Sequence, residues 1–164
     1  MFPFKNYYHF FIFLFYFGIA FSQDTHSKEF VYEYDSHGAL IAEGWLCRGE
    51  KVDYWYFYHS NGVVSKKGHF NKGEKKGYWY FYNPSGKLEK EGHFENGKAE
   101  NWWIFYNQNN QAKFQYKNNK KNGFALLYEK NKLMKAEKYE DDQKVGEWTS
   151  LSAFKMDNPN APLK

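Results

Sequence analysis

The sequence lacks a second cysteine, and this shortage constrains how the fold can be stabilised. Its only cysteine, Cys47, can form no disulfide within the chain, so the fold must be stable without covalent cross-links. In the repeat pattern described below, Cys47 takes the place of Asn71, Glu95 and Lys117, which are polar residues at turn edges. We therefore expect Cys47 to be exposed, where it either pairs with another chain or remains an inert thiol.

The sequence also has little aliphatic content after its first 22 residues, and it has no concentrated basic face. The net charge of the 164 residues is only +4, and the lysines fall in short segments such as 72–76 and 117–121. This pattern predicts solvated turns and argues against nucleic-acid binding. Because aliphatic residues are few, apolar burial must come mainly from aromatic rings, which favours a thin, sheet-like architecture.

No constellation of residues with catalytic or metal-binding spacing is present. The serines lack the context of a nucleophile elbow, and Asp141-Asp142 lacks the oxygen-rich spacing of a calcium loop. His69 and His93 occupy equivalent repeat positions two strands apart, which is too far for easy coordination of one metal ion. We therefore predict no catalytic residues, no metal site and no cofactor, and hence a protein that is not an enzyme.

The first 22 residues have the pattern of a cleavable signal peptide. Lys5 and the free amine give a positive start, residues 7–19 form an almost unbroken apolar run, and Ala20 and Ser22 place small residues before a cut at Gln23. We therefore expect export, to the periplasm or beyond. The alternative is an uncleaved anchor, which would be the only membrane contact expected of the chain.

The dominant feature of the remainder is internal repetition. Tyr54-Trp55-Tyr56-Phe57-Tyr58 returns 24 positions later as Tyr78-Trp79-Tyr80-Phe81-Tyr82, and again as Trp102-Trp103-Ile104-Phe105-Tyr106. Ala125 and Trp148 continue the tryptophan series at intervals of 22 and 23. Asparagine, which also tolerates positive φ, replaces glycine at Asn101, Asn110 and Asn119. The glycine series with this period are Gly38, Gly62 and Gly86; Gly44, Gly68 and Gly92; Gly49, Gly73 and Gly97; and Gly77, Gly123 and Gly146.

The pattern of each unit predicts one β-hairpin. An aromatic strand is followed by a tight turn at Asn61-Gly62 or Pro84-Ser85-Gly86, a second strand, and a Gly/Lys-rich turn. No stretch has convincing helical periodicity. We predict an all-β, elongated, single-layer antiparallel meander of tandem hairpins. The predicted division is a signal peptide at 1–22, a linker at 23–29, about five repeats over 30–155 (30–53, 54–77, 78–101, 102–123, 124–146 and a partial 147–155) and a tail at 156–164.

Side-chain alternation predicts two different faces. A two-residue turn at Asn61-Gly62 places Trp55 opposite Gly68 and puts Phe57 on one face with Val64 and Phe70. The tyrosines then line the other face. A three-residue loop at 84–86 would instead shift the pairing by one and exchange the faces, so this alternative stays open. We favour tryptophan and phenylalanine facing inward, with tyrosine and lysine facing outward.

Gly77-Tyr78-Trp79-Tyr80-Phe81-Tyr82, followed by Gly86, Gly92-His93-Phe94 and Gly97, resembles the bacterial variant of the MORN repeat. The resemblance extends from Phe30 to about Lys155 and implies a twisted meander of successive hairpins. Some members of that family are antitoxin components, and MORN repeats in general are associated with protein or membrane contacts. The sequence departs from the pattern at Ala125 and Phe114, and its export signal departs from a cytoplasmic antitoxin role.

We therefore predict a protein-binding or scaffold module whose partner is another protein or a cell-surface polysaccharide. The alternatives are a glycan-binding module that uses the aromatic face, and an antitoxin or immunity-like protein that neutralises a partner toxin. The expected structural anchors are Trp55, Trp79, Trp103, Gly68 and Gly92, and the expected contact residues are Tyr56, Tyr58, Tyr80, Tyr82 and Tyr106.

Overall fold

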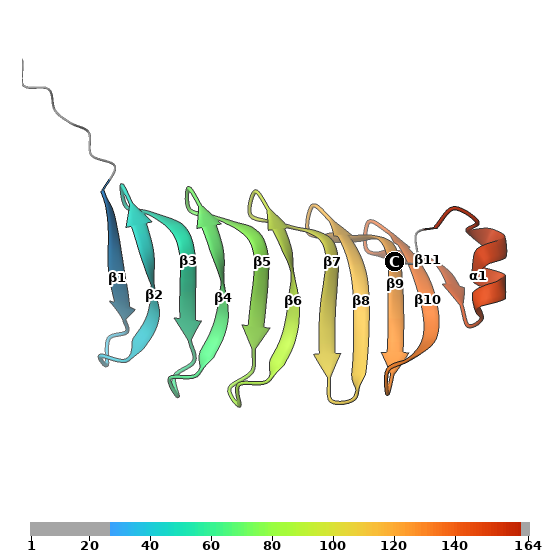
Figure 1. The fold of residues 1–164 in the computed structure, drawn as a ribbon, viewed down its shortest axis with the longest axis horizontal. Coiled ribbons are helices and arrows are strands. Elements are labelled where there is room, and N and C mark those ends of the chain that lie inside the picture. Colours follow the sequence, from blue (N-terminus) through green and yellow to red (C-terminus); the bar gives the residue numbers. More distant parts are fainter. Residues whose placement is uncertain (1–26, 162–164) are drawn as a thin grey trace, which may run out of the picture.

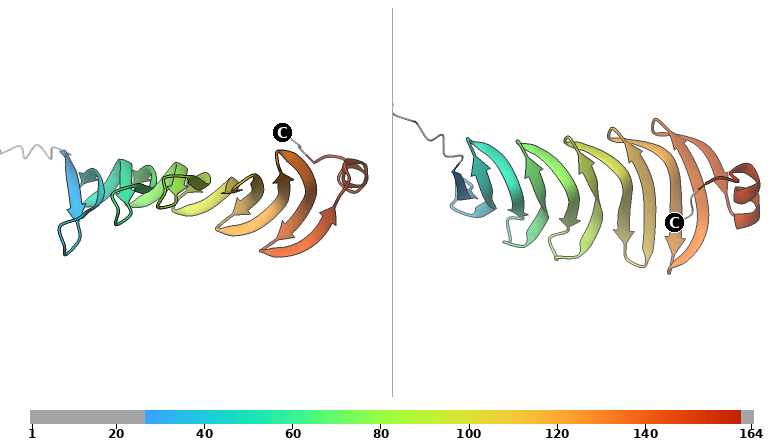
Figure 2. Two further views of the ribbon diagram at one scale, coloured as in Figure 1. Left: turned by 90° about the horizontal axis from the view of Figure 1, so that it is seen from below. Right: turned by 45° about the horizontal axis from the view of Figure 1, so that its top comes forward.

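The chain forms one open antiparallel sheet of 11 strands, in which each strand pairs with its neighbours in sequence. A computed structural model describes residues 27–161, so the expected signal peptide lies outside the described residues. The strands stand in a row in chain order (Figure 1), and the row twists along its length (Figure 2). The predicted fold, a single-layer meander of β-hairpins, is confirmed. Within residues 27–161, no helix has the length and apolar character needed to cross a membrane.

The strands are β1 (Lys28–Tyr34), β2 (Leu40–Cys47), β3 (Glu50–Tyr58), β4 (Val64–Asn71), β5 (Glu74–Tyr82), β6 (Leu88–Glu95), β7 (Lys98–Asn107), β8 (Asn110–Lys117), β9 (Lys120–Glu129), β10 (Lys132–Glu140) and β11 (Gln143–Trp148), and they are followed by the helix α1 (Leu151–Asp157).

The turn between β3 and β4 differs from the two-residue turn expected from its sequence. The His59 N–H donates to the Val63 carbonyl (2.8 Å), and the Gly62 N–H donates to the His59 carbonyl (2.9 Å), which leaves a three-residue loop. Gly62 has a φ of 80°, a left-handed conformation that glycine adopts at little cost. The turn after Asn83 has the same hydrogen bonds. The Asn61-Gly62 and Pro84-Ser85-Gly86 sequences therefore form one type of loop.

The predicted pairing of Trp55 with Gly68 is nevertheless confirmed, because two displacements cancel. The third loop residue shifts the register by one, and a bulge at Ser65 shifts it back, so that Tyr58 pairs with Val64 and Phe57 with Lys66. Val64 therefore lies on the tyrosine face, and its predicted place beside Phe57 was wrong. The tryptophans and tyrosines keep the faces that we favoured. The lysines do not all face outward as we expected, because Lys66 pairs with Phe57 on the tryptophan face.

The loop residue and the bulge also explain why the fourth repeat, 102–123, is shorter than the others. Strands β7 and β8 pair without a register shift, from Trp103 opposite Phe114 to Asn107 opposite Asn110, so this hairpin lacks both the third loop residue and the bulge. These two residues account for the change in spacing from 24 to 22. Asn110 therefore belongs to a strand, and its predicted left-handed turn conformation was wrong.

The turns at the opposite ends of the strands connect successive units. Lys72 and Gly73 both have positive φ, as the mirror-image type I′ turn of a two-residue hairpin requires, and so do Asn118 and Asn119. The Gly73 N–H donates to the Lys51 carbonyl one unit earlier (2.9 Å). Gly97, Asn119 and Asp142 make the equivalent bond in later units. These four turns are thus hydrogen-bonded to the preceding hairpin.

The core forms where a tryptophan ring covers a glycine of the preceding strand. A Cβ added at Gly68 would lie 2.4 Å from the Trp79 ring, and the same close approach occurs at Gly44 and Gly92. A bulge interrupts the β4–β5 ladder between Gly68 and His69, and the Trp79 indole N–H donates to the His69 carbonyl there (3.0 Å). The equivalent tryptophans, Trp55 and Trp103, make this bond at 2.9 and 3.2 Å.

Neighbouring rings enclose each of these tryptophans although the sheet has only one layer. Phe70 lies edge-on to Trp79 with the ring centroids 5.1 Å apart, and the Lys75 ammonium lies 4.9 Å from the Trp79 centroid. Trp55 and Trp79 are fully buried, and Trp103 is almost so. Burying an indole of roughly 200 Å² contributes roughly 5 kcal/mol before entropy costs. We refer to the face that carries these tryptophans as the inner face.

The pairing of a tryptophan with a glycine changes in the last strands, β8 to β11. Phe114 on β8 pairs with Ala125 on β9, so the large and small partners exchange strands and the complementarity of the pair is kept. On β11, Glu147 pairs with the inner-face Glu137, and Trp148 pairs with Ala136 on the opposite face. The predicted place of Trp148 in the tryptophan series was therefore wrong by one residue, because the last bulge is one residue shorter.

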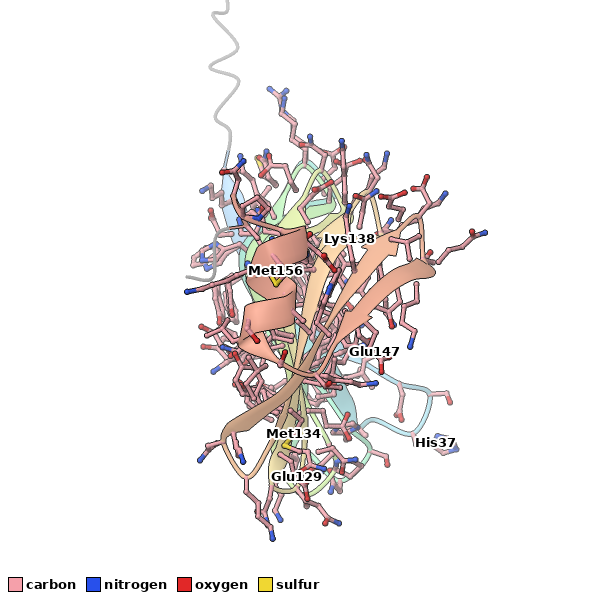
Figure 3. All side chains as sticks on the ribbon, turned by 90° about the vertical axis from the view of Figure 1, so that its right-hand side faces the viewer. His37, Glu129, Met134, Lys138, Glu147 and Met156 are labelled. Atoms are coloured by element: carbon pink, nitrogen blue, oxygen red, sulfur yellow. The ribbon has the colours of Figure 1, made fainter. Side chains whose placement is uncertain are left out.

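The helix α1 begins in the segment expected to be a partial hairpin, 147–155, and ends in the expected tail. Ser150 begins it as an N-cap whose hydroxyl accepts the Ala153 N–H (3.3 Å), and Phe154 is its one buried residue. Seven residues make only two turns, which is too short for a helical period to be recognisable in sequence. Figure 3 looks along the sheet from this end and shows α1, with Met156, to one side of the ribbon.

We expect Gly68→Ala to lower the free energy of unfolding by about 1–3 kcal/mol, because the new methyl group overlaps the Trp79 ring. Urea denaturation followed by tryptophan fluorescence measures the change. Ser65→Ala, at the neighbouring bulge, is the control and should stay within about 0.5 kcal/mol of the natural protein. A Gly68→Ala protein as stable as this control would contradict the packing described.

Candidate functional site on the outer face

The face opposite the tryptophan core, here called the outer face, carries rows of aromatic side chains on alternate strands. On β3 and β5 the rows consist of tyrosines, which pair across β4 and β6 with residues such as Lys67 and Glu91. The predicted contact residues all lie on this face and are half-buried. The outer-face residues of β3, β5 and β7 are Tyr54, Tyr56 and Tyr58; Tyr78, Tyr80 and Tyr82; and Trp102, Ile104 and Tyr106.

A row of charges of alternating sign runs across the middle of the outer face. Glu43 on β2 and Lys67 on β4 both pair with Tyr56, while Glu91 on β6 pairs with Tyr80. Lys113 on β8 continues the row beside Ile104. Each charge therefore lies two strands, roughly 10 Å, from the next. The outer face is therefore polar and aromatic at once, and its charges alternate in sign.

Two tyrosine hydroxyls are held by the acidic members of this row. Tyr58 donates to Glu43 and Tyr106 donates to Glu91, each at 2.6 Å. Burial, followed by these hydrogen bonds to carboxylates, raises the pKa of Tyr58 and the pKa of Tyr106 to about 12. The two rings are therefore fixed in orientation, and their hydroxyls stay protonated at neutral pH.

The basic member Lys67 positions the tyrosines of the next hairpin. Its ammonium lies 5.6 Å from the ring centroids of both Tyr80 and Tyr82, within the range of cation–π attraction. Burial opposes the charged form, but a hydrogen bond with Tyr82, together with the electrostatic influence of Tyr82, Tyr54 and Tyr56, outweighs it and raises the pKa of Lys67. The predicted contact residues thus form one connected surface over β2 to β7, with Tyr56 and Tyr80 at its centre.

The aromatic surface continues past the predicted residues toward the N-terminal end. Phe30 on β1 lies 5.3 Å, centroid to centroid, from both Tyr32 and Trp45. These three side chains are 42%, 56% and 39% exposed. The sequence reasoning missed them, together with Glu43 and Glu91. A usable signal exists, because a charged residue directly precedes each glycine of the series that begins at Gly44.

The opposite end of the outer face is covered by the chain itself. Phe154 of α1 packs against Phe124 and Trp148, with ring centroids 5.3 Å away in both cases, and is only 2% exposed. The Trp148 indole N–H donates to Asp157 of α1 (2.7 Å). A cleft of about 230 Å³ remains beside the helix and is lined largely by apolar residues such as Leu126 and Leu133.

Of the remaining sequence candidates, His69 and His93 pair with Tyr54 and Tyr78 on the outer face. Cys47 ends β2, just as Asn71, Glu95 and Lys117 end their strands, but its side chain is half-buried where we expected exposure. Among residues 27–161, no group of three or more histidine, cysteine, aspartate or glutamate side chains is arranged to hold a metal ion. The outer face therefore offers aromatic contact and fixed charges, which are means of binding.

Neither a known protein family nor a curated protein matches this chain. The resemblance to the MORN-repeat variant therefore stays a prediction, and the function has to be argued from the residues of the outer face.

We expect Glu43→Gln to lower the pKa of Tyr58 toward its ordinary value, because the replacement removes the negative charge beside the hydroxyl. Carbon NMR of ring-labelled tyrosine across an alkaline titration measures it. Tyr106, which keeps Glu91, is the internal control and should remain at about 12. An unchanged Tyr58 pKa in the variant would show that the glutamate does not hold this ring.

Proposed function

We propose that this chain is an exported, non-enzymatic module that binds another protein through its outer face. The observation that carries the proposal is the contrast between the two aromatic faces. The inner-face Trp55 and Trp79 are 0% exposed, whereas Tyr78 on the outer face is 39% exposed. Neighbouring exposed aromatic side chains are typical of interaction surfaces, where tyrosine and tryptophan are enriched.

The contact made by α1 supports a protein partner for this face. There the outer-face side chains Phe124 and Trp148 receive one aromatic side chain, Phe154, from a short helix. A polar contact, from Trp148 to Asp157, lies at the edge of this apolar contact. Within the described residues, β1 to β7 present a similar combination of rings and charges with no such cover.

The alternating charges favour a protein over a neutral polysaccharide as the partner. Glu43, Lys67 and Glu91 fix ring orientation, and their charges alternate in sign across the centre of the surface. A row of this kind gives register and specificity when a partner carries the complementary charges. A neutral sugar chain offers no such charges, although it could stack on the tyrosine rings.

Export forms part of the proposal and rests on the pattern of residues 1–22. We expect amino-terminal sequencing of the protein from the extracytoplasmic fraction to begin at Gln23, because the small residues before it match a signal-peptidase site. A mature protein that still begins at Met1 would contradict cleavage and would favour the membrane-anchored alternative.

Photo-cross-linking in the producing cells tests the binding surface. We expect a benzoylphenylalanine group placed at Tyr56 or Tyr80 to yield a discrete protein adduct, because these positions lie at the centre of the surface. The same group at Asn96, in the β6–β7 turn, is the control and should yield none.

Adducts of equal intensity at Asn96 would contradict a specific outer-face site. A companion assay compares retention on insoluble cell-wall polysaccharide by the natural protein and by the Tyr56→Ala, Tyr80→Ala double variant. Retention that depends on these tyrosines, in the absence of any protein adduct, would replace the protein partner with a glycan.

A further inference from the structure

The inner face carries a cluster of three lysines whose ammonium groups lie over two phenylalanine rings, Phe57 and Phe81. Phe81 on β5 pairs with Lys66 on β4 and with Lys90 on β6, so the two lysines flank it from neighbouring strands. The Lys90 ammonium lies 5.0 Å from the Phe81 centroid, and the Lys75 ammonium lies 5.7 Å from it. The third ammonium, that of Lys66, lies over the adjacent Phe57 at 4.6 Å. We call Lys66, Lys75 and Lys90 the inner lysine cluster.

The cluster has no carboxylate partner within residues 27–161, where none of its members makes an ion pair. Burial, followed by repulsion from Lys66 and Lys90, lowers the pKa of Lys75. The aromatic rings offer only partial compensation, because a cation–π contact does not neutralise the charge. The three side chains are half-buried, so the cluster is not closed off from solvent.

The first unit shows how such a lysine accepts an anion. Lys51, the counterpart of Lys75, lies over Trp55 at 3.4 Å and forms an ion pair with the Glu33 carboxylate. One unit later, the position equivalent to Glu33 is Phe57. Within the described part of the chain, Lys51 therefore has a carboxylate partner and Lys75 has none, although both ammonium groups lie over a tryptophan.

The cluster also belongs specifically to the middle of the sheet. At the positions equivalent to Lys66 and Lys90, the units on either side carry Ala42 on β2 and Ala112 on β8. Both alanines pair with phenylalanines, as the lysines do, so the packing at this position does not require a charge. The two lysines therefore add positive charge only where Lys75 lacks its counter-ion.

We propose that the inner lysine cluster binds an oxyanion with two or more negative charges. The anion lies on the solvent side of the ammonium groups, in the role that Glu33 has for Lys51. A lysine ammonium acts as a point charge without the fixed hydrogen-bonding fork of arginine. The site therefore selects an anion by its charge and its size, and not by the geometry of its oxygen atoms. Phosphate and carboxylate groups are therefore both accepted. This site lies on the opposite face from the proposed protein contact and does not depend on it.

Isothermal titration calorimetry of the mature protein at low ionic strength tests the site, with inorganic triphosphate and citrate as probes. We expect saturable binding of one anion per chain for both probes. The triple variant Lys66→Met, Lys75→Met, Lys90→Met removes the charges but keeps apolar stems over the rings. It should weaken binding by about tenfold or more, the effect of losing several charge-assisted contacts.

The matched control, Lys76→Met, Lys87→Met, Lys98→Met, removes the same charge from exposed positions and should stay within about twofold of the natural protein. The single variant Lys90→Met, which alters one flanking lysine, should still bind more weakly if the triple variant fails to fold. Equal weakening in the control, binding of only one of the two probes, or no saturable binding by the natural protein would overturn the proposal.

Discussion

The fold depends on the contact between a tryptophan ring and a glycine on the preceding strand. A single-layer sheet has no second layer to cover its apolar side chains, so each large ring must be buried by neighbours in its own sheet. Gly68 allows the Trp79 indole to lie directly on the backbone, and the bulge beside it provides a carbonyl for the indole N–H. The glycine, the bulge beside it and the neighbouring rings together bury the indole and satisfy its only polar atom.

This contact connects each hairpin only to its neighbours, so stability should accumulate along the row as in other repeat proteins. The turns strengthen the same connections, since the Gly73 and Gly97 amides donate to carbonyls one unit earlier. Because these contacts lie on the inner face, the side chains of the outer face can differ from those of the inner face. The inner face holds the buried tryptophans, whereas the outer face can carry exposed rings and charges without loss of the core.

Much of this structure could be predicted because the period of 24 and the alternation of side chains are local properties. The pairing of Trp55 with Gly68 followed from them, although the two-residue turn assumed at Asn61-Gly62 was wrong. The bulge at Ser65 corrected the register, and bulges leave little trace in sequence because almost any residue can occupy them. The place of Trp148 was wrong for the same reason, since a bulge shorter by one residue moves a side chain to the other face.

The candidate surface was predicted less completely than the fold. The row of tyrosines is visible in the repeat, so Tyr56 and Tyr80 could be placed on the outer face. The contacts that orient the rings could not be predicted, because strand pairing brings Glu43 and Glu91 to tyrosines 15 positions away in the sequence. The cover by α1 likewise depends on Phe154, a single aromatic residue in a segment without periodicity.

Hydrogen exchange of the six indole N–H groups, followed by NMR, tests the role of the tryptophans most directly. We expect the Trp55, Trp79 and Trp103 indoles to exchange only through cooperative unfolding, because their N–H groups are bonded to strand carbonyls in the core. The 39% exposed Trp45, on the outer face, should exchange much faster. Equal rates for the core and outer-face indoles would contradict the account.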